Sequence, residues 1–288
     1  MKMSTAWFRF REFSPADYFT AVAGLGLDYV EVTLYSDSSK WFGPVLPDDT
    51  RRLAEDCGVR MVAGVAALDL AAPFDELGRP LTEDAAGYSR VMGLRVIDQA
   101  EALGLDVVRI TEPNIGPEHQ HLAEKYVNDI GVALRPIADR ARDKGIQVAV
   151  ENYGLTSDQM VWLLDAADHE NVGTLFDPCN YARMGEDPLE ALLKIQDRVV
   201  YCHLKDTRRD EQGTPEAFFP GSRWRPSVAV GDGDIDWAPL LKTLTESYSG
   251  YASIEYENVD DLLLGTRRSL DYVAAILQRA DRATSVAI

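Results

Sequence analysis

Short apolar runs alternate with longer amphipathic segments along the chain, and several of these runs end abruptly in an ionisable residue. Runs of this length, rich in β-branched residues, predict parallel strands that are buried on both faces. The clearest is Val199-Val200-Tyr201-Cys202-His203-Leu204-Lys205-Asp206. Residues 146–151, 172–177 and 251–255 end in the same way. The pattern therefore predicts strands that deliver polar groups at their carboxyl ends.

The rest of the chain continues this alternation. Four more strands are predicted around Ser4 to Phe10, and at Tyr29 to Leu34, Val59 to Val65 and Val107 to Thr111. Apolar positions at helical spacing, with capping residues and glycine stops, predict the helices. They cover Ser14 to Gly26, Leu46 to Cys57, Glu83 to Leu103, Glu118 to Lys144, Thr156 to Ala167, Asp187 to Asp197, Trp237 to Tyr248 and Asp260 to Ala280. About eight strands alternating with eight helices indicate an α/β fold, a (β/α)₈ TIM barrel that forms a single domain over residues 1–288.

A Pro/Gly/Arg-rich segment from Thr207 to Asp234 lengthens one unit of this alternation. We interpret it as a long loop within one βα unit, although residues 226–230 could instead form a strand and disturb the count. Phe218, Phe219 and Trp224 make the loop aromatic enough to be a lid that excludes water. A contact between subunits is the alternative reading of the same residues.

Four of the predicted strands end in side chains that can bind a metal ion. In one parallel barrel, Glu151, Asp177, His203 and Glu255 would meet at a single mouth. A lone strand-end carboxylate more often caps a helix or forms an ion pair, but four such groups together favour a metal site. Three carboxylates and one imidazole suit a divalent cation, Mn²⁺ first, with Mg²⁺, Co²⁺ or Zn²⁺ as alternatives. Such a cation would polarise a substrate carbonyl while a glutamate removes the neighbouring C–H proton.

Charge and composition narrow the partners. The formal net charge of −18 would repel phosphate backbones and anionic membrane surfaces, so we expect a small carbohydrate substrate and neither nucleic acid nor a membrane. The amino-terminal residues have no apolar core of signal-peptide length, and the three cysteines form no CxxC pair. We therefore expect a cytoplasmic protein.

Five motifs resemble those of the sugar phosphate isomerase/epimerase family, the xylose isomerase-like barrels. They are Val150-Glu151-Asn152-Tyr153-Gly154, Phe176-Asp177-Pro178-Cys179-Asn180, His203-Leu204-Lys205-Asp206, Gly231-Asp232-Gly233-Asp234-Ile235-Asp236-Trp237 and Ser253-Ile254-Glu255-Tyr256-Glu257. The resemblance covers nearly the whole chain. It implies that Glu151, Asp177, His203 and Glu255 bind the metal and that the two glutamates exchange protons with the substrate. It also allows a homo-oligomer.

Two positions depart from the family pattern. Tyr153 stands where many relatives carry histidine, and Asn180 stands where the epimerases tend to carry histidine. With an ordinary pKa of about 10, Tyr153 is better suited to act as a catalytic acid than as a base. Asn180 would offer the substrate a hydrogen-bond donor and acceptor instead of a titrating group. Lys205 and Arg208, near the end of the His203 strand, and Arg109 are further candidates for substrate binding, although Lys205 could instead pair with Asp206.

These residues leave several functions open. The first expectation is a metal-dependent isomerase or epimerase of a sugar or sugar-like polyol. The alternative keeps the metal and the barrel but expels a β-substituent, as a lyase or dehydratase acting on a 3-oxo-glycoside, an inosose or a dehydroshikimate-type substrate. An apurinic-site endonuclease on the same barrel would need a site built from several histidines, and the chain has four in all. A binding protein that has lost its metal is the fourth hypothesis.

Overall fold

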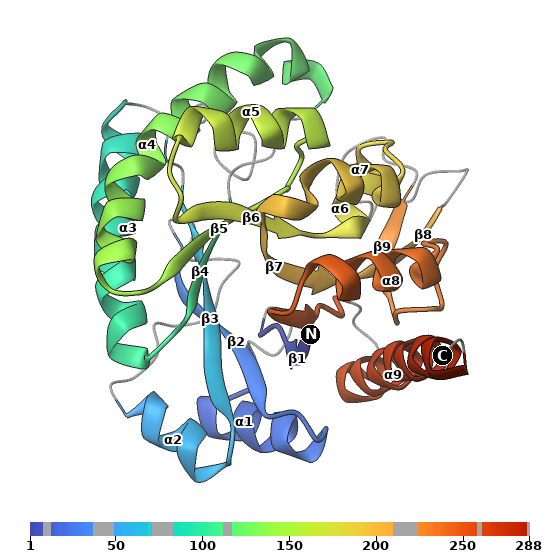
Figure 1. The fold of residues 1–288 in the computed structure, drawn as a ribbon. Coiled ribbons are helices and arrows are strands. Elements are labelled where there is room, and N and C mark those ends of the chain that lie inside the picture. Colours follow the sequence, from blue (N-terminus) through green and yellow to red (C-terminus); the bar gives the residue numbers. More distant parts are fainter. Residues whose placement is uncertain are drawn as a thin grey trace.

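The computed structural model describes residues 1–7, 13–36, 49–68, 70, 83–111, 117–209, 224–257 and 261–286. Within these residues, eight parallel strands close into a barrel in the order β1-β10-β7-β6-β5-β4-β3-β2 (Figure 1). The strands are β1 (Lys2–Thr5), β2 (Tyr29–Ser36), β3 (Arg60–Ala67), β4 (Val107–Thr111), β5 (Gln147–Glu151), β6 (Val172–Phe176), β7 (Val199–Leu204) and β10 (Tyr251–Ile254). The predicted TIM barrel is confirmed.

Helices follow the strands and surround the barrel (Figure 1). They are α1 (Pro15–Gly24), α2 (Thr50–Asp56), α3 (Glu83–Leu103), α4 (Ala123–Asp143), α5 (Ser157–Ala167), α6 (Pro178–Arg183), α7 (Pro188–Ile195), α8 (Trp237–Ser247) and α9 (Leu262–Val286), with short 3₁₀ turns η2 (Pro117–Leu122) and η3 (Gln196–Arg198). Local chemistry sets several starts: Ser14 caps α1, and Thr156 and Gln159 form a capping box at α5. None of the helices in the described part of the chain combines the length and apolar character needed to span a bilayer.

The element boundaries differ from the predicted ones in a few places. The first strand begins earlier than predicted, because Lys2 already pairs with Tyr251 of β10. It ends at Thr5, and residues 8–12 lie outside the described part. The second predicted helix is described from Thr50 onward. The short helix α6, directly after β6, was missed by the sequence analysis.

The segment after β7 forms a second, smaller sheet. Here β8 (Asp206–Arg209) and β9 (Trp224–Val228) pair antiparallel and lie outside the barrel. The alternative strand considered at residues 226–230 therefore exists in part, but it pairs with β8 and leaves the barrel count unchanged. Residues 210–223 lie outside the described part, so the lid and the subunit contact stay predictions.

The side chains that point into the barrel form an apolar layer and a charged layer. A small buried cluster includes one residue from each of four neighbouring strands, Val107, Ala149, Leu175 and Tyr201. Successive side chains of a strand point to opposite faces, so the residue two positions further on shares the interior face. Those residues are Arg109, Glu151, Asp177 and His203, all buried. An apolar layer inside the barrel thus supports a charged layer nearer the carboxyl ends of the strands.

Candidate metal and catalytic site

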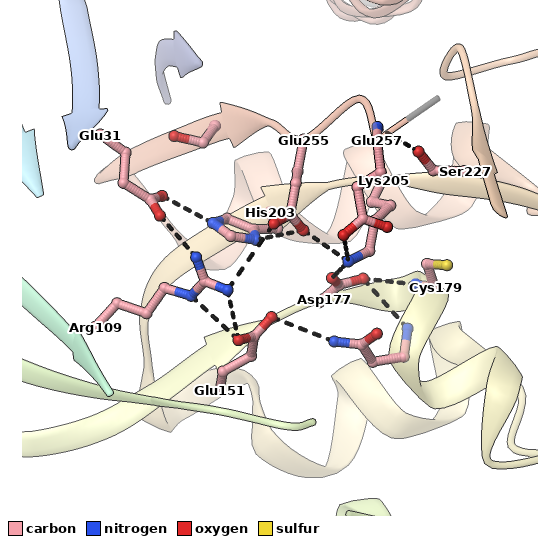
Figure 2. Close-up of polar contacts among 12 residues, drawn as sticks. Glu31, Arg109, Glu151, Asp177, Cys179, His203, Lys205, Ser227, Glu255 and Glu257 are labelled. Atoms are coloured by element: carbon pink, nitrogen blue, oxygen red, sulfur yellow. Dashed lines mark hydrogen bonds and ion pairs between the residues drawn. The ribbon is translucent and has the colours of Figure 1, made fainter. Parts of the chain in front are cut away.

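The structure brings the four predicted metal ligands together. Glu151 ends β5, Asp177 follows β6, His203 lies in β7 and Glu255 follows β10. One donor atom from each lies within 4.8 Å of the others, and all four residues are buried. Figure 2 shows their side chains converging from strands that are far apart in the sequence. The grouping that the sequence analysis expected at one barrel mouth is therefore present.

The local fold fixes the orientation of the Asp177 side chain, one of the four candidate metal ligands. Asp177 caps helix α6, so its Oδ1 accepts hydrogen bonds from the main-chain N–H groups of Cys179 (2.9 Å) and Asn180 (3.2 Å). The side chain of Asn152 holds the Asp177 backbone in place through two hydrogen bonds of 3.0 Å. These contacts leave Oδ2 facing the other three ligands.

The donor set fits a divalent cation. Asp177 Oδ2 is buried and makes no hydrogen bond to any residue that the structure describes, although Lys205 Nζ lies 3.1 Å away. Burial raises the pKa of Asp177, because a buried carboxylate without enough compensating contacts disfavours its charge. A cation bound beside Oδ2 would give this oxygen a partner and would offset the cost of burying the carboxylate charge. Oxygen ligands with one imidazole are a donor set that Mn²⁺, Mg²⁺, Co²⁺ and Zn²⁺ accept.

Lys205 turns into the site. Its Nζ donates to Glu255 Oε2 at 2.7 Å and lies 3.5 Å from Glu257 Oε1. Asp206, the other partner considered for Lys205, instead accepts hydrogen bonds from Gly231 N (2.9 Å) and Trp237 Nε1 (2.8 Å). Burial acts to raise the pKa of Glu255, but Lys205 and His203 outweigh it and hold this pKa well below its usual range. Glu255 is thus ionised and able to bind a cation.

Arg109 crosses the site between two carboxylates. Its Nε and Nη2 donate to Glu151 Oε2 at 3.1 and 2.6 Å, and its Nη1 donates to Glu31 Oε1 at 2.8 Å. Thr111 and Asn180 also donate to Glu151, at 3.0 and 3.3 Å. Glu151 is therefore held on several sides. The predicted substrate-binding residues Arg109 and Asn180 both contact this ligand directly.

Glu31 in β2 is part of the site, although the sequence analysis missed it. Its Oε2 lies 2.8 Å from His203 Nε2, while His203 Nδ1 lies 3.0 Å from Glu255 Oε2. Burial acts to lower the pKa of His203, but the two glutamates outweigh it and raise this pKa to about 10. The signal was present in the sequence as one charge inside the apolar run Tyr29-Val30-Glu31-Val32.

A second group of side chains lies next to the four ligands. Burial raises the pKa of Tyr153 well above its ordinary value, and Glu257 adds to this, so the phenol keeps its proton. The side chain of Arg183 in α6 is buried, and its Nη2 lies 4.0 Å from Glu257 Oε2. Like Glu31, Arg183 was not predicted, because nothing in the local pattern separates it from a surface arginine.

Arg208 lies apart from these groups. It is exposed in β8, and its Nε donates to the main-chain oxygen of Asp232 at 2.7 Å. Its predicted contact with substrate therefore rests on the sequence alone, whereas Lys205, Asn180 and Arg109 lie within the buried cluster.

The fold and the cluster together define a parallel (β/α)₈ barrel with a site for a divalent cation at the carboxyl ends of its strands. Residues 19–276 match the xylose isomerase-like TIM barrel family, and the chain belongs to that family. This confirms the resemblance that the motifs carry.

Individual proteins resemble the chain in sequence or in fold. An inosose dehydratase from Lacticaseibacillus casei is 26% identical over 269 residues, which cover 87% of this chain and 90% of that protein. A D-tagatose 3-epimerase-like protein shares the fold with a TM-score of 0.74 at 18% identity, over 99% of this chain and 100% of that one. The structure of the IOLI protein with a binding zinc atom has a TM-score of 0.73 at 18% identity, over 97% and 99%. At this level of identity the structural matches show a shared fold.

Proposed function

We propose that this protein is a divalent-metal-dependent lyase that removes water from a cyclic polyol ketone of the inosose type. The similarity to an inosose dehydratase spans 87% of the chain, and it favours the lyase alternative of the sequence analysis over the isomerase or epimerase expected first. The observation that carries the proposal is the buried cluster of Glu151, Asp177, His203 and Glu255, with ligand atoms within 4.8 Å of one another.

These four side chains would hold the cation. When bound, it supplies positive charge that polarises the substrate carbonyl and makes the neighbouring C–H group more acidic. The IOLI protein, which has the same fold, binds zinc, so Zn²⁺ joins Mn²⁺ among the ions to be tested.

The chain supplies a base and an acid for the elimination. We assign proton removal to Glu151, because Lys205 and His203 hold the pKa of Glu255 well below its usual range and so make Glu255 a poor base. The C–H electrons form the new carbon–carbon double bond, and the hydroxyl on the next carbon leaves. Tyr153, whose raised pKa keeps its phenol protonated, gives that hydroxyl its proton, so that it departs as water. Transfer of the proton from Glu151 to the Tyr153 phenolate then restores both groups.

Arg109, Thr111 and Lys205 position the reacting groups. Arg109 and Thr111 bind one oxygen of Glu151, which leaves the other oxygen beside the Asn180 amide, at 3.3 Å. Lys205 lies between Glu255 and Asp177, from where it can donate a hydrogen bond to a substrate oxygen. Except for the partly buried Thr111, these groups are buried, so the electrostatic contacts act with little screening by water.

Epimerisation is the second candidate, favoured by one specific observation. Glu151 and Glu255 bring two carboxylates to the same small space from β5 and β10, which is the arrangement needed to remove a proton on one face and return it on the other.

A single NMR experiment in D₂O separates the two candidates. The metal-loaded protein is incubated with a keto-inositol and, separately, with ketohexoses. The lyase proposal predicts an unsaturated or diketo product formed with loss of water from the keto-inositol. Deuterium exchange with inversion and without loss of water would support the epimerase instead. Neither reaction with any of Mn²⁺, Co²⁺, Mg²⁺ or Zn²⁺ would exclude both for these substrates.

A further inference from the structure

Among the described residues, Glu31 contacts His203 on the ring nitrogen opposite the one that faces Glu255. Its Oε2 lies 2.8 Å from His203 Nε2, and both side chains are buried, with exposed fractions of 1% and 0%. His203 Nδ1 faces the other way, 3.0 Å from Glu255 Oε2 (Figure 2). The two ring nitrogens therefore have different partners.

We propose that Glu31 is a positioning residue: it binds the Nε2–H group of His203 and thereby turns Nδ1 toward the cation. This inference rests on the proposed metal site. A neutral imidazole carries its proton on one nitrogen and binds metal through the other, and a carboxylate that accepts from one nitrogen fixes this choice. Both ring nitrogens face a carboxylate, but Glu255, beside Nδ1, is itself a proposed ligand and would share the cation with that nitrogen. Glu31 would stay an acceptor beside Nε2 and hold the proton there.

Glu31 reaches a second ligand through Arg109. Its Oε1 accepts from Arg109 Nη1 at 2.8 Å, and the same guanidinium binds Glu151 Oε2 through Nη2 at 2.6 Å. One carboxylate in β2 therefore links His203 in β7 to Glu151 in β5. Since the guanidinium is planar and binds both carboxylates at fixed angles, a shift of Glu31 would move both ligands. Arg109 would then hold Glu151 in position, in addition to any contact that it makes with substrate.

The position of Glu31 in the barrel makes this role specific. It is the third residue of β2 and lies on the interior face, and its main-chain oxygen accepts a hydrogen bond from the buried Tyr18 hydroxyl at 3.0 Å. The backbone that carries Glu31 is therefore held independently of the metal. A shorter acidic side chain at this position would keep the charge but would not reach His203.

The test measures metal binding without substrate. The protein is stripped of metal, and Zn²⁺ affinity is determined by competition with a chelating dye for the unaltered protein, Glu31→Asp and Glu31→Gln. The Asp variant keeps the charge and breaks the contact, whereas the Gln variant loses the charge and keeps an acceptor for Nε2–H. Glu186→Gln is a matched control, because Glu186 binds Ser157 at 2.6 Å and belongs to another part of the molecule.

We expect Glu31→Asp to weaken Zn²⁺ binding about 10- to 100-fold, the range found when such outer partners are removed. The Glu186→Gln control should change the Zn²⁺ affinity less than about twofold, because Glu186 contacts none of the proposed ligands in the described structure. Unchanged affinity in Glu31→Asp would overturn the inference while leaving the proposed lyase intact. Absence of Zn²⁺ binding by the unaltered protein would remove the proposed function together with this inference.

A second measurement needs no variant in Glu31. Long-range ¹H–¹⁵N NMR of the zinc-loaded protein reports which imidazole nitrogen carries the proton, and the His203 signals are assigned as those missing from His203→Asn. We expect the proton on Nε2 and zinc on Nδ1. The opposite arrangement would overturn the inference even if Glu31→Asp failed to fold.

Discussion

Lys205 Nζ lies 2.7 Å from Glu255 Oε2 at the adjoining ends of β7 and β10. The ammonium group contributes to the low pKa of Glu255 and so keeps this proposed metal ligand ionised in a buried place. The same Nζ is 3.1 Å from Asp177 Oδ2, so one cationic side chain bridges two of the four proposed ligands.

Replacing either glutamate ligand by its amide should abolish turnover without unfolding the barrel. In Glu151→Gln and Glu255→Gln the side-chain shape is kept, but a charge proposed to bind the metal is lost, and Glu151→Gln also removes the proposed base. We expect activity to fall at least about 10²- to 10⁴-fold, the range for loss of a general base. Steady-state rates and circular dichroism would be measured together. Full activity in both folded variants would rule out the mechanism.

Removal of metal should inactivate the protein reversibly. Dialysis against a chelator takes away the charge that polarises the substrate carbonyl, and added Mn²⁺, Co²⁺ or Zn²⁺ should restore the rate. Metal content is checked by elemental analysis before and after dialysis. A metal-free preparation that keeps its full rate would contradict the proposed site.

Metal affinity should increase with pH. The pKa of His203 is raised to about 10 without a cation, so the imidazole is protonated throughout the neutral range and must lose a proton to bind metal. One proton released per ion predicts up to about a tenfold gain in affinity per pH unit between pH 6 and 9. Calorimetry in two buffers with different ionisation enthalpies would count the protons. An affinity that is flat over this range would contradict the prediction.

The phenol of Tyr153 should matter for elimination and not for metal binding. In Tyr153→Phe the acid that protonates the departing hydroxyl is gone, so we expect the rate to fall about 10²- to 10⁴-fold while Zn²⁺ affinity stays near that of the unaltered protein. Tyr126→Phe, in α4 on the outside of the barrel, is the matched control. If both variants retain the normal rate, another group supplies the proton.

Asp206 should be needed for stability. Its carboxylate accepts from Gly231 N at 2.9 Å, Gly233 N at 3.2 Å and Trp237 Nε1 at 2.8 Å, and so fastens β8 to the start of α8. Asp206→Ala leaves these donors without that acceptor, at about 1–3 kcal/mol for each one that stays buried. We therefore expect the free energy of unfolding to fall by roughly 3 kcal/mol or more in urea titrations.

Two comparisons sharpen that stability measurement. Asp206→Asn keeps one acceptor oxygen and should lose less than Asp206→Ala. Asp232→Ala removes a carboxylate that pairs with the exposed Arg268 on the surface, and it should cost less than about 1 kcal/mol. Equal losses in Asp206→Ala and Asp232→Ala would show that the buried hydrogen bonds add little.

The sequence determined the barrel and the grouping of the four candidate metal ligands. Apolar runs that stop at Glu151, Asp177, His203 and Glu255 are a local signal, and parallel strands necessarily place such ends at one edge. Only the tertiary structure decided the partners of Glu31, since Arg109 and His203 are 78 and 172 residues away along the chain. It also decided that Lys205 turns inward and that β9 pairs outside the barrel. Periodicity describes each strand separately, whereas these contacts arise when the barrel closes and brings distant strands within hydrogen-bond distance.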